Sequence, residues 1–421
     1  MRGMELLSIA AQAQLNYTYY SAPPMPPVPP VENLYFCNVT VTYTHPGWDD
    51  TITVLTLLPL EGRWDGRFMG NGGGGLIAGG HSSLQFSVMP GLESGFSVST
   101  TDGGHTDRLD YTKLYDINWA LSSEGNINWP LLVDFAHLAL HDMAVIAINW
   151  ASFLFANIYP GFVMDTLKTY PPPCEIDAMT RAAIATCDLL DGVEDGIISY
   201  PGKCQFDPRG LVGAPFECDG DQKIFSAEAA EVVAACWDGP RSKDGEFQWF
   251  GFGYDANLTQ PLIGPASTTL DAHDEWDELV HACTSEFSSI IGTSDPDLSE
   301  FRNAGGKMLN WHGTADQAIP YNGSVSYYDR VLEKDPNARE FYRLFLAPGA
   351  DHTTHVGIVP SFEHTLGVIV NWVENNVAPD TLSAKGLDGL GRQSERPLCA
   401  YPRVQHYVGG DPTVPEAFTC V

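Results

Sequence analysis

The sequence predicts an α/β fold that is interrupted by a large insertion. Short apolar, β-branched runs followed by glycine-rich or polar loops occur near both ends of the chain, and residues 129–147 and 361–377 have apolar positions at helical spacing. Residues 148–304 differ in composition, because they are rich in Pro, Gly and Asp and hold six of the nine cysteines. We therefore expect a core made of residues 1–147 and 305–421, with an inserted domain between them.

Composition and charge narrow the classes of function. The 421 residues are 44% hydrophobic and 18% charged, which is ordinary for a globular chain with a sizeable core. The net charge of −31 argues against nucleic acid, whose phosphates need Lys and Arg, and against anionic membranes. No run reaches the ~18 apolar residues that suggest a membrane-spanning helix.

Cysteines and glycosylation motifs favour an oxidising, extracellular setting. Four Asn-x-Ser/Thr motifs occur, at Asn16, Asn38, Asn257 and Asn322. The N-terminal stretch MRGMELLSIAAQAQ does not complete a signal peptide, because Glu5 interrupts an already short apolar run. We expect a secreted protein whose natural start is missing or altered here.

The N-terminal part is expected to begin with an extended arm and a hairpin. Residues 21–31, SAPPMPPVPPV, hold too many prolines for a helix or a central strand. Residues 34–44 and 50–60 are β-branched and aromatic, and the turn HPGWD separates them, which predicts a hairpin. The apolar stretch at 67–71 then leads into a glycine run.

The glycine run at 72–75 has two interpretations. Taken alone, such a run predicts a flexible loop. Glycines also let a backbone N–H approach a substrate oxygen, as in an oxyanion hole. Since this run precedes the region where a nucleophile is expected, we favour the second interpretation, with Gly73 and Gly74 as the candidates.

The helix predicted at 129–147 carries His137 and His141 four residues apart on one face. Two histidines at this spacing can ligate a metal. No Glu and no third ligand stands nearby in the sequence, so ordinary helix histidines are the favoured interpretation.

Residues 187–204, CDLLDGVEDGIISYPGKC, gather three aspartates in one short loop. Such carboxylates repel one another unless a hard cation lies between them, and calcium accepts six to eight oxygens in flexible geometry. The glycines allow backbone carbonyls to turn towards the ion. The spacing is not that of an EF-hand, and a solvated acidic turn is the alternative. The predicted calcium ligands are Asp188, Asp191, Val193, Asp195 and Ile197.

Helical patterning recurs at 175–187 and at 226–236, where Ser226 is a plausible helix start. Two further strands are predicted, at 307–311 and 341–347. Polar loops follow both strands: Asp316 follows the first, and His352 follows the second.

Several stretches resemble the tannase and feruloyl esterase family, which consists of secreted α/β-hydrolases with a large lid domain. They are CD-x-LDGV-x-DG-I in the acidic loop, GRFMGNGGGG (66–75), STTDGGHT (99–106), HDMAV (141–145), HGTADQAIP (312–320) and RPLCAYPRVQHYVGGDP (396–412). The resemblance implies an α/β-hydrolase core over 1–147 and 305–421 and a lid domain with the calcium loop over 148–304. It also implies a carboxylic ester hydrolase that acts on small-molecule or polysaccharide-linked esters of phenolic acids, feruloyl or galloyl.

In an α/β-hydrolase the triad arrives in the order Ser, Asp, His, each on a loop after a strand. Asp316 and His352 fit this order, so Asp316 is expected to orient the imidazole and His352 to act as general base. The alternative is that both are ordinary loop residues, and the neighbouring Asp351 competes with Asp316 for the role. Calcium is expected to be structural, because the triad needs no metal.

Two disulfides are expected with this resemblance: Cys187–Cys204, which closes the calcium loop, and Cys399–Cys420 in the tail. Sequence spacing leaves the other cysteines unconnected. These are Cys37, Cys174, Cys218, Cys236 and Cys283.

The serine nucleophile is not found. No G-x-S-x-G occurs, and the family's Cys-Ser-x-Gly-Gly elbow is absent after HDMAV, where Ala147 runs directly into a lid-like stretch. The missing strand–helix–strand block needs about thirty residues or more. Ser94 and Ser152 lack the elbow context, and Thr353 stands where the family has a cysteine that bonds the elbow. A sheet without its central strands exposes apolar edges, so we expect this chain to fold poorly.

Two explanations remain open: a gene-model or splicing deletion in an active lineage, or a degenerate, inactive relative. Accordingly, the first hypothesis is a phenolic-acid esterase, and the second is a non-catalytic, calcium-stabilised glycoprotein. A calcium-dependent carbohydrate-binding module is disfavoured by the helix-rich lid and by the pair Asp316 and His352. Four lid aromatics are candidates for lining a phenolic pocket, with core packing as the alternative: Trp249, Phe250, Phe252 and Tyr254.

Overall fold

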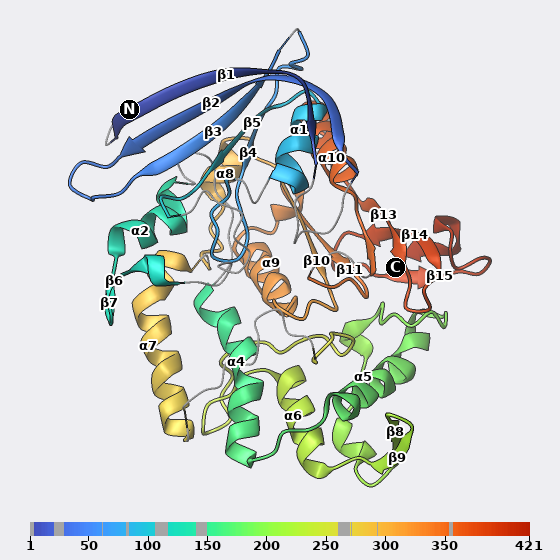
Figure 1. Ribbon diagram of the computed structural model, residues 1–421. Coiled ribbons are helices and arrows are strands. Elements are labelled where there is room, and N and C mark those ends of the chain that lie inside the picture. Colours follow the sequence, from blue (N-terminus) through green and yellow to red (C-terminus); the bar gives the residue numbers. More distant parts are fainter. Residues whose placement is uncertain are drawn as a thin grey trace. The chain divides into compact units, whose positions relative to one another are not determined.

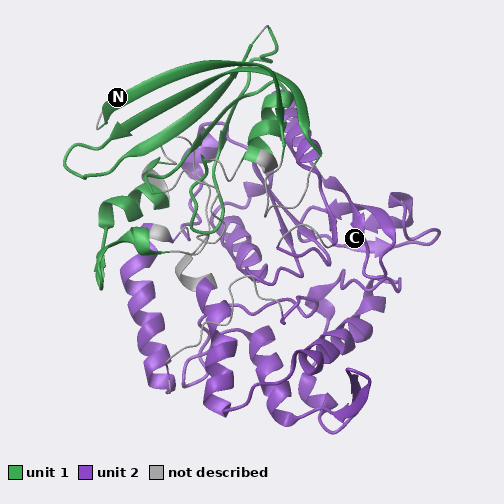
Figure 2. Cartoon of the chain, viewed as in Figure 1, with its two compact units in different colours: residues 1–148 green, residues 149–421 purple. Residues whose placement is uncertain are grey.

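The computed structural model divides into two compact units, residues 1–148 and 149–421 (Figure 2), and each is described by itself. The residues described are 4–20, 29–60, 62–80, 84–105, 117–139, 150–259, 270, 272–292, 294–352 and 357–421. Most of the predicted arm at 21–31, His141, the join at Ala147 and Thr353 lie outside them.

Unit 1 is built on a five-stranded sheet (Figure 1). Its order is β1 (Glu5–Tyr19), β2 (Val31–Thr44), β3 (Ile52–Pro59), β5 (Ser97–Thr101) and β4 (Phe68–Asn71). Neighbouring strands are antiparallel except β4 and β5, which are parallel. The predicted hairpin is β2–β3, in which Val41 lies opposite Val54. Tyr43, Ile52 and Val98 are buried. The N-terminal stretch considered as an altered leader contributes the edge strand β1.

The remaining elements of unit 1 are short. They are the π-helical turn η2 (Leu84–Val88), α1 (Met89–Glu93), η4 (Asn118–Ala120), β6 (Leu121–Ser123), β7 (Asn126–Ile127), α2 (Trp129–Val133) and the π-helical turn η5 (Asp134–Leu138). The Asn128 side chain caps α2 by accepting a hydrogen bond from Leu131 N–H at 3.4 Å. The helix predicted at 129–147 therefore begins as expected but widens into a π-turn at Asp134.

The first part of unit 2 is mainly helical (Figure 1). Its elements are α4 (Trp150–Leu167), α5 (Pro173–Cys187), η6 (Asp188–Asp191), η7 (Pro201–Lys203), η8 (Pro208–Leu211), the hairpin β8 (Pro215–Cys218) and β9 (Asp221–Ile224), α6 (Ala227–Asp238), α7 (His273–Ile291) and α8 (Ser299–Asn303). The helix start predicted at Ser226 is confirmed, because its Oγ accepts from Ala229 N–H. Phe162 and Trp276 pack face to face, with ring centroids 5.2 Å apart, which joins α4 to α7.

The second part of unit 2 alternates strands and helices. It contains β10 (Met308–Gly313), α9 (Asn322–Lys334), η9 (Ala338–Glu340), β11 (Tyr342–Ala347), β12 (Gly357–Val359), α10 (Phe362–Asn375), β13 (Thr381–Leu387), β14 (Gln393–Cys399), β15 (Gln405–Tyr407), η10 (Pro415–Ala417) and β16 (Phe418–Cys420). Strands β10 and β11 are parallel, and β12–β13–β14 form an antiparallel sheet. Phe345, Leu382 and Leu398 are fully buried in one apolar cluster. That the lid forms a separate domain over 148–304 stays a prediction.

The described strands do not form one continuous sheet. Within the described part of the chain β10 pairs with β11 alone, and β4 ends the sheet of unit 1. All side chains of β10 from Met308 to His312 are only half-buried, whereas most of those of β11 are buried. Strands inside a parallel sheet are covered on both faces. Among the strands that the structure describes, one side of β10 is therefore unpaired.

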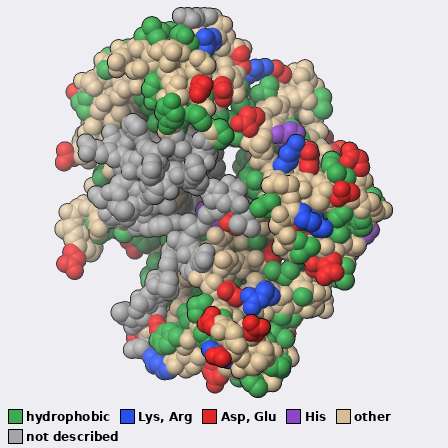
Figure 3. All heavy atoms as spheres, turned by 45° about the vertical axis from the view of Figure 1, so that its right-hand side comes forward, with side chains coloured by type: hydrophobic (Ala, Val, Ile, Leu, Met, Phe, Trp, Pro, Cys, Tyr) green, Lys and Arg blue, Asp and Glu red, His purple; other side chains and the backbone are tan. Residues whose placement is uncertain are grey.

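On the face shown in Figure 3, acidic side chains are spread over the surface, and basic side chains form no broad patch. No helix among the described residues is both long enough and apolar enough to cross a membrane.

Candidate active site

Asp316 and His352 are brought together by two parallel strands. Gly313 at the end of β10 is in register with Ala347 at the end of β11, so the loops that follow leave the same edge. These loops are tied to each other: Thr314 N–H donates to Ala347 O at 3.0 Å, and Gly349 N–H donates to Thr314 Oγ1 at 3.1 Å. This register therefore places Asp316 and His352 close together, as expected of the acid–base pair of a hydrolase.

Asp316 is held by four hydrogen bonds. Its Oδ1 accepts from the backbone N–H groups of Ala318 and Ile319, at 2.8 and 2.7 Å. Its Oδ2 lies 3.0 Å from His352 Nδ1 and 3.2 Å from His312 Nε2. Burial raises the pKa of Asp316, but the two histidine contacts outweigh burial and hold the pKa well below its usual range. The carboxylate is therefore ionised and fixed in direction.

His352 is half-exposed, and its Nδ1 faces the buried Asp316. Its backbone N–H donates to Gln317 Oε1 at 3.1 Å, which fixes the loop. Burial lowers the pKa of His352, but the hydrogen bond and charge of Asp316, followed by the charge of Asp351, raise it above the ordinary value. With Nδ1 bound to Asp316, Nε2 is the nitrogen available for proton transfer.

His312 is a member of this site that sequence reasoning missed. Its Nδ1 lies 2.8 Å from Ser324 Oγ, and its Nε2 lies 3.2 Å from Asp316 Oδ2 and 3.1 Å from Ile319 O. Since carboxylate and carbonyl oxygens only accept, the proton belongs on Nε2, and Nδ1 accepts from the serine hydroxyl. His312 therefore positions Asp316. In the sequence, the position of His312 as the first residue of the HGTADQAIP stretch could have indicated this role.

Residues from the helical part of unit 2 adjoin the loop that carries Asp316. Asn157 Nδ2 donates to Ala318 O at 2.8 Å. A Cβ added to Gly253 would lie 2.1 Å from Thr314 O, so the backbone at Gly253 touches this loop where only glycine fits. Of the four candidate pocket aromatics, Phe252 is buried in a small core cluster, which favours core packing for it. Trp249, Phe250 and Tyr254 stay half-exposed.

The acidic loop is compact and its three aspartates are buried. Asp188 accepts from Asp195 N–H at 3.1 Å and from Gly196 N–H at 2.9 Å, and Asp191 accepts from Val193 N–H. Asp195 Oδ2 lies 2.7 Å from Arg396 Nη2, and the arginine is only 1% exposed. Three carboxylates and one guanidinium leave two surplus negative charges in a buried place.

Disulfide bonds close the acidic loop and link two parts of the C-terminal tail. The structure contains both expected bonds, Cys187–Cys204 and Cys399–Cys420, and a third, Cys174–Cys218, that links α5 to β8. Cys37, Cys236 and Cys283 are free.

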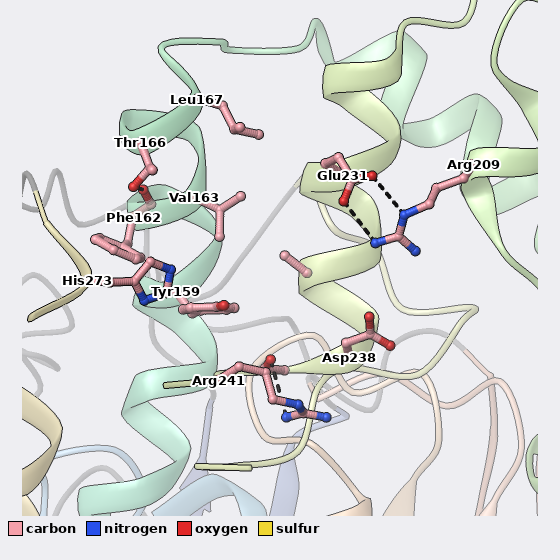
Figure 4. A pocket seen from close by; sticks show the side chains of 12 residues that line it. Tyr159, Phe162, Val163, Thr166, Leu167, Arg209, Glu231, Asp238, Arg241 and His273 are labelled. Atoms are coloured by element: carbon pink, nitrogen blue, oxygen red, sulfur yellow. Dashed lines mark hydrogen bonds and ion pairs between the residues drawn. The ribbon is translucent and has the colours of Figure 1, made fainter. Parts of the chain in front are cut away.

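A pocket of about 290 Å³ lies between α4 and α6 in the helical part of unit 2 (Figure 4). Tyr159, Phe162 and Arg241 line it, and the ion pair between Arg209 and Glu231 lies along one wall. No residue predicted for the site from the sequence lines this pocket. It is therefore separate from the pair Asp316 and His352.

Comparison with known proteins shows to which family the chain belongs. A family model described as tannase and feruloyl esterase matches residues 147–271 and 258–421. A probable feruloyl esterase of Arthroderma benhamiae is 32% identical over 502 aligned positions, which cover 99% of this chain and 91% of that protein. This chain belongs to the tannase and feruloyl esterase family. The family's named members are carboxylic ester hydrolases.

Two further relatives agree with this family. The tannase of Aspergillus oryzae is 26% identical, with 92% of this chain and 85% of that protein covered. The solved structure of a tannin acyl hydrolase from Aspergillus niger has a TM-score of 0.82 at 24% sequence identity, and covers 100% of this chain and 92% of that one. This likeness shows the fold, which is of the α/β-hydrolase type.

The two glycines considered for an oxyanion hole lie in unit 1. A Cβ added to Gly73 would lie 2.1 Å from Ile77 O, so only glycine fits there, whereas Gly74 has open space around it. Ile77 N–H donates to Gly74 O at 3.2 Å, which closes a tight turn after β4. The role of these glycines stays a prediction for this member of the tannase and feruloyl esterase family.

Replacing Asp316 with Asn is expected to lower the pKa of His352, because the amide keeps the shape but loses the charge. The raised pKa of His352 contributes stability that is present below its unfolded value of about 6.5 and is lost as pH rises through the folded value. The variant should therefore lose more stability at pH 5.5 than at pH 9. NMR titration of His352 and urea unfolding at both pH values check this; an unchanged pKa contradicts the charge interaction.

Proposed function

We propose that this chain is the scaffold of a hydrolase for esters of phenolic acids, feruloyl or galloyl, with its acid–base half complete and its serine nucleophile missing. The observation that carries the proposal is the 3.0 Å contact between His352 Nδ1 and Asp316 Oδ2 beside two parallel strands. The alternative is a catalytically inactive, calcium-stabilised glycoprotein derived from the same family.

The reaction proposed for the complete enzyme is acyl transfer through a serine ester. His352 Nε2 takes the proton from the serine hydroxyl as its oxygen attacks the ester carbon, and then gives that proton to the departing alcohol. Water repeats the sequence and releases the phenolic acid. Asp316 stabilises the imidazolium, and the backbone N–H groups of Gly73 and Gly74 are the proposed donors to the carbonyl oxygen.

The absence of the nucleophile segment is supported by two observations. Among the described strands, β10 pairs with β11 alone and has half-buried side chains on both faces, as expected of a strand without a second neighbour. The 502 positions aligned with the probable feruloyl esterase exceed the 421 residues of this chain, so that relative has segments without a counterpart here. The motif order puts the missing block between Ala147 and Ile148.

The lid is proposed to bind the phenolic ring. Trp249 lies against α9, since a Cβ added to Gly323 would lie 3.1 Å from the Trp249 ring. The next residue along α9, Ser324, contacts His312. An aromatic side chain here could stack on a planar acyl group close to the acid–base pair. This supports a small-molecule or polysaccharide-linked phenolic ester as substrate.

The acidic loop is proposed to hold one structural calcium ion. Its ligands would be the side chains of Asp188, Asp191 and Asp195 and the main-chain carbonyls of Val193 and Ile197. Two surplus negative charges match a divalent cation, and the buried Oδ2 of Asp191 has no hydrogen-bond partner among the described residues. The three carboxylates do not meet within 4.8 Å of one another. Calcium–oxygen distances of 2.3–2.6 Å allow opposed ligands to lie about 5 Å apart.

Removing calcium is expected to lower the melting temperature. An ion at 100 times its Kd stabilises the folded state by about 2.7 kcal/mol, and a loss of that size lowers Tm by roughly 3 °C in a chain of 421 residues. Calorimetry with and without a chelator measures the shift. Asp191→Asn is the control, and its Tm should not respond to the chelator. A wild-type Tm that is unchanged by the chelator contradicts the site.

An extracellular location is part of the proposal. Three disulfides are typical of oxidising compartments, and Asn16 and Asn257 are exposed, as glycosylation requires.

The experiment that tests the function restores the missing segment. The block that the Arthroderma benhamiae relative carries would be inserted between Ala147 and Ile148, and turnover of methyl ferulate and methyl gallate would be followed. The proposal predicts turnover by the restored chain and none by the chain as it stands. A restored chain that is folded but inactive favours the non-catalytic glycoprotein.

A further inference from the structure

We infer that His45, Asp50 and Asp134 form a binding site for a divalent transition-metal ion of the zinc type. All three lie in unit 1, whereas the acidic loop and the pair Asp316 and His352 belong to unit 2. One imidazole nitrogen and two carboxylate oxygens are ligands that zinc accepts, with water as the fourth ligand.

The spacing of the ligand atoms fits a small ion. His45 Nδ1 lies 2.6 Å from Asp50 Oδ2 and 3.6 Å from Asp134 Oδ1, and all three ligand atoms lie within 4.8 Å of one another. Ligands about 2.1 Å from a tetrahedral ion lie roughly 3.4 Å apart. The two distances from His45 Nδ1, 2.6 and 3.6 Å, lie on either side of this value. Among the described residues, this cluster is the one that combines such spacing with ligands not already used in a disulfide.

The ligands are held before any ion arrives. Asp50 Oδ1 accepts from Thr44 Oγ1 at 2.7 Å and from His45 N–H at 2.8 Å, which turns Oδ2 towards the imidazole. The imidazole packs against Tyr43 and Trp48, with ring centroids 5.7 and 5.2 Å away. Fixed ligands lower the ordering cost of binding.

The third ligand lies in a segment with an unusual backbone conformation. Asp134 is the first residue of the π-helical turn η5, and such turns are frequent at functional sites. Its side chain is fully buried, and His45 and Asp50 are more than nine-tenths buried. Two carboxyl groups and one imidazole that are buried together are costly to hold charged without a cation or a proton between them. The competing interpretation is a network that shares protons and binds no metal.

Binding requires loss of protons. Zinc takes the lone pair of His45 Nδ1, so the hydrogen that faces Asp50 must leave or move to Nε2, and both carboxyl groups must be ionised. No electron transfer is involved.

The test uses the full chain after chelator treatment, titrated with Zn²⁺ by calorimetry, with bound metal counted by mass spectrometry. One zinc per chain is expected. Asp134→Asn and His45→Gln should each weaken binding by more than the roughly 100-fold that loss of an outer-shell partner costs. Lys243→Met, at an exposed ion pair in unit 2, should bind zinc as the wild type does.

A second readout does not depend on the variants folding. X-ray absorption of the zinc-loaded wild type should show nitrogen and oxygen neighbours and no sulfur, which separates this site from the free cysteines. Any of three results would overturn the inference in favour of a proton-sharing network: the wild type takes up no zinc, sulfur ligates the metal, or the variants bind zinc with unchanged affinity.

Discussion

Replacing His352 with Ala in the chain with a restored nucleophile segment is expected to lower kcat for methyl ferulate by about 10⁴- to 10⁶-fold. The reason lies in the geometry of the ring: Nδ1 is bound to Asp316 at 3.0 Å, so Nε2 is the base that activates the serine. Binding of the substrate should change little, because the half-exposed imidazole contributes little contact area. Steady-state kinetics at matched protein concentration measure the change.

Asp351→Asn is the matched control for this experiment. Asp351 is adjacent to His352 and raises its pKa only as a minor contribution after Asp316. The control should change kcat far less than His352→Ala does, since it removes only a minor influence on the pKa of His352 and leaves Asp316 in place. If both variants lose activity equally, Asp316 is not the residue that orients the base.

Replacing Arg396 with Met is expected to destabilise the chain by about 3–5 kcal/mol, because it leaves buried carboxylates without their guanidinium. Arg396 lies 2.7 Å from Asp195 Oδ2, and its guanidinium carbon lies 4.4 Å above the ring of Phe418. The methionine keeps most of the packing but not the charge. Urea unfolding in the presence and absence of calcium measures the change.

Lys243→Met provides the comparison for Arg396. Lys243 pairs with Asp274 at 2.8 Å, but both side chains are exposed, so the pair is screened by solvent. No measurable change in stability is expected. If Arg396→Met is equally silent, the buried loop does not depend on this arginine for charge balance.

The elements that the sequence predicts well are those set by local pattern. Alternating β-branched residues specify the hairpin β2–β3, and Ser226 marks the start of α6. The pairing of Asp316 with His352 was accessible because each follows a strand, and the ends of neighbouring parallel strands meet at one edge. These predictions need only the spacing of the apolar residues, the helix-capping residue and the order of the strands along the chain.

The features that the sequence did not predict depend on contacts between distant segments. Arg396 belongs to the tail but lies against Asp195 in the acidic loop. Cys174 and Cys218 meet because α5 packs beside β8, and spacing alone leaves several pairings open. The π-turn at Asp134 breaks a helical pattern that the apolar periodicity would continue. The contact of His312 with Asp316 depends on the direction of the imidazole ring, which the sequence does not show.

The most direct test of the central claim is labelling of the chain as it stands with a fluorophosphonate, followed by peptide mapping. Such probes react with a serine that a neighbouring base has activated. The sequence contains no G-x-S-x-G elbow, so the account predicts that a folded chain that binds calcium carries no label. A labelled peptide would identify a nucleophile within these 421 residues and contradict the account.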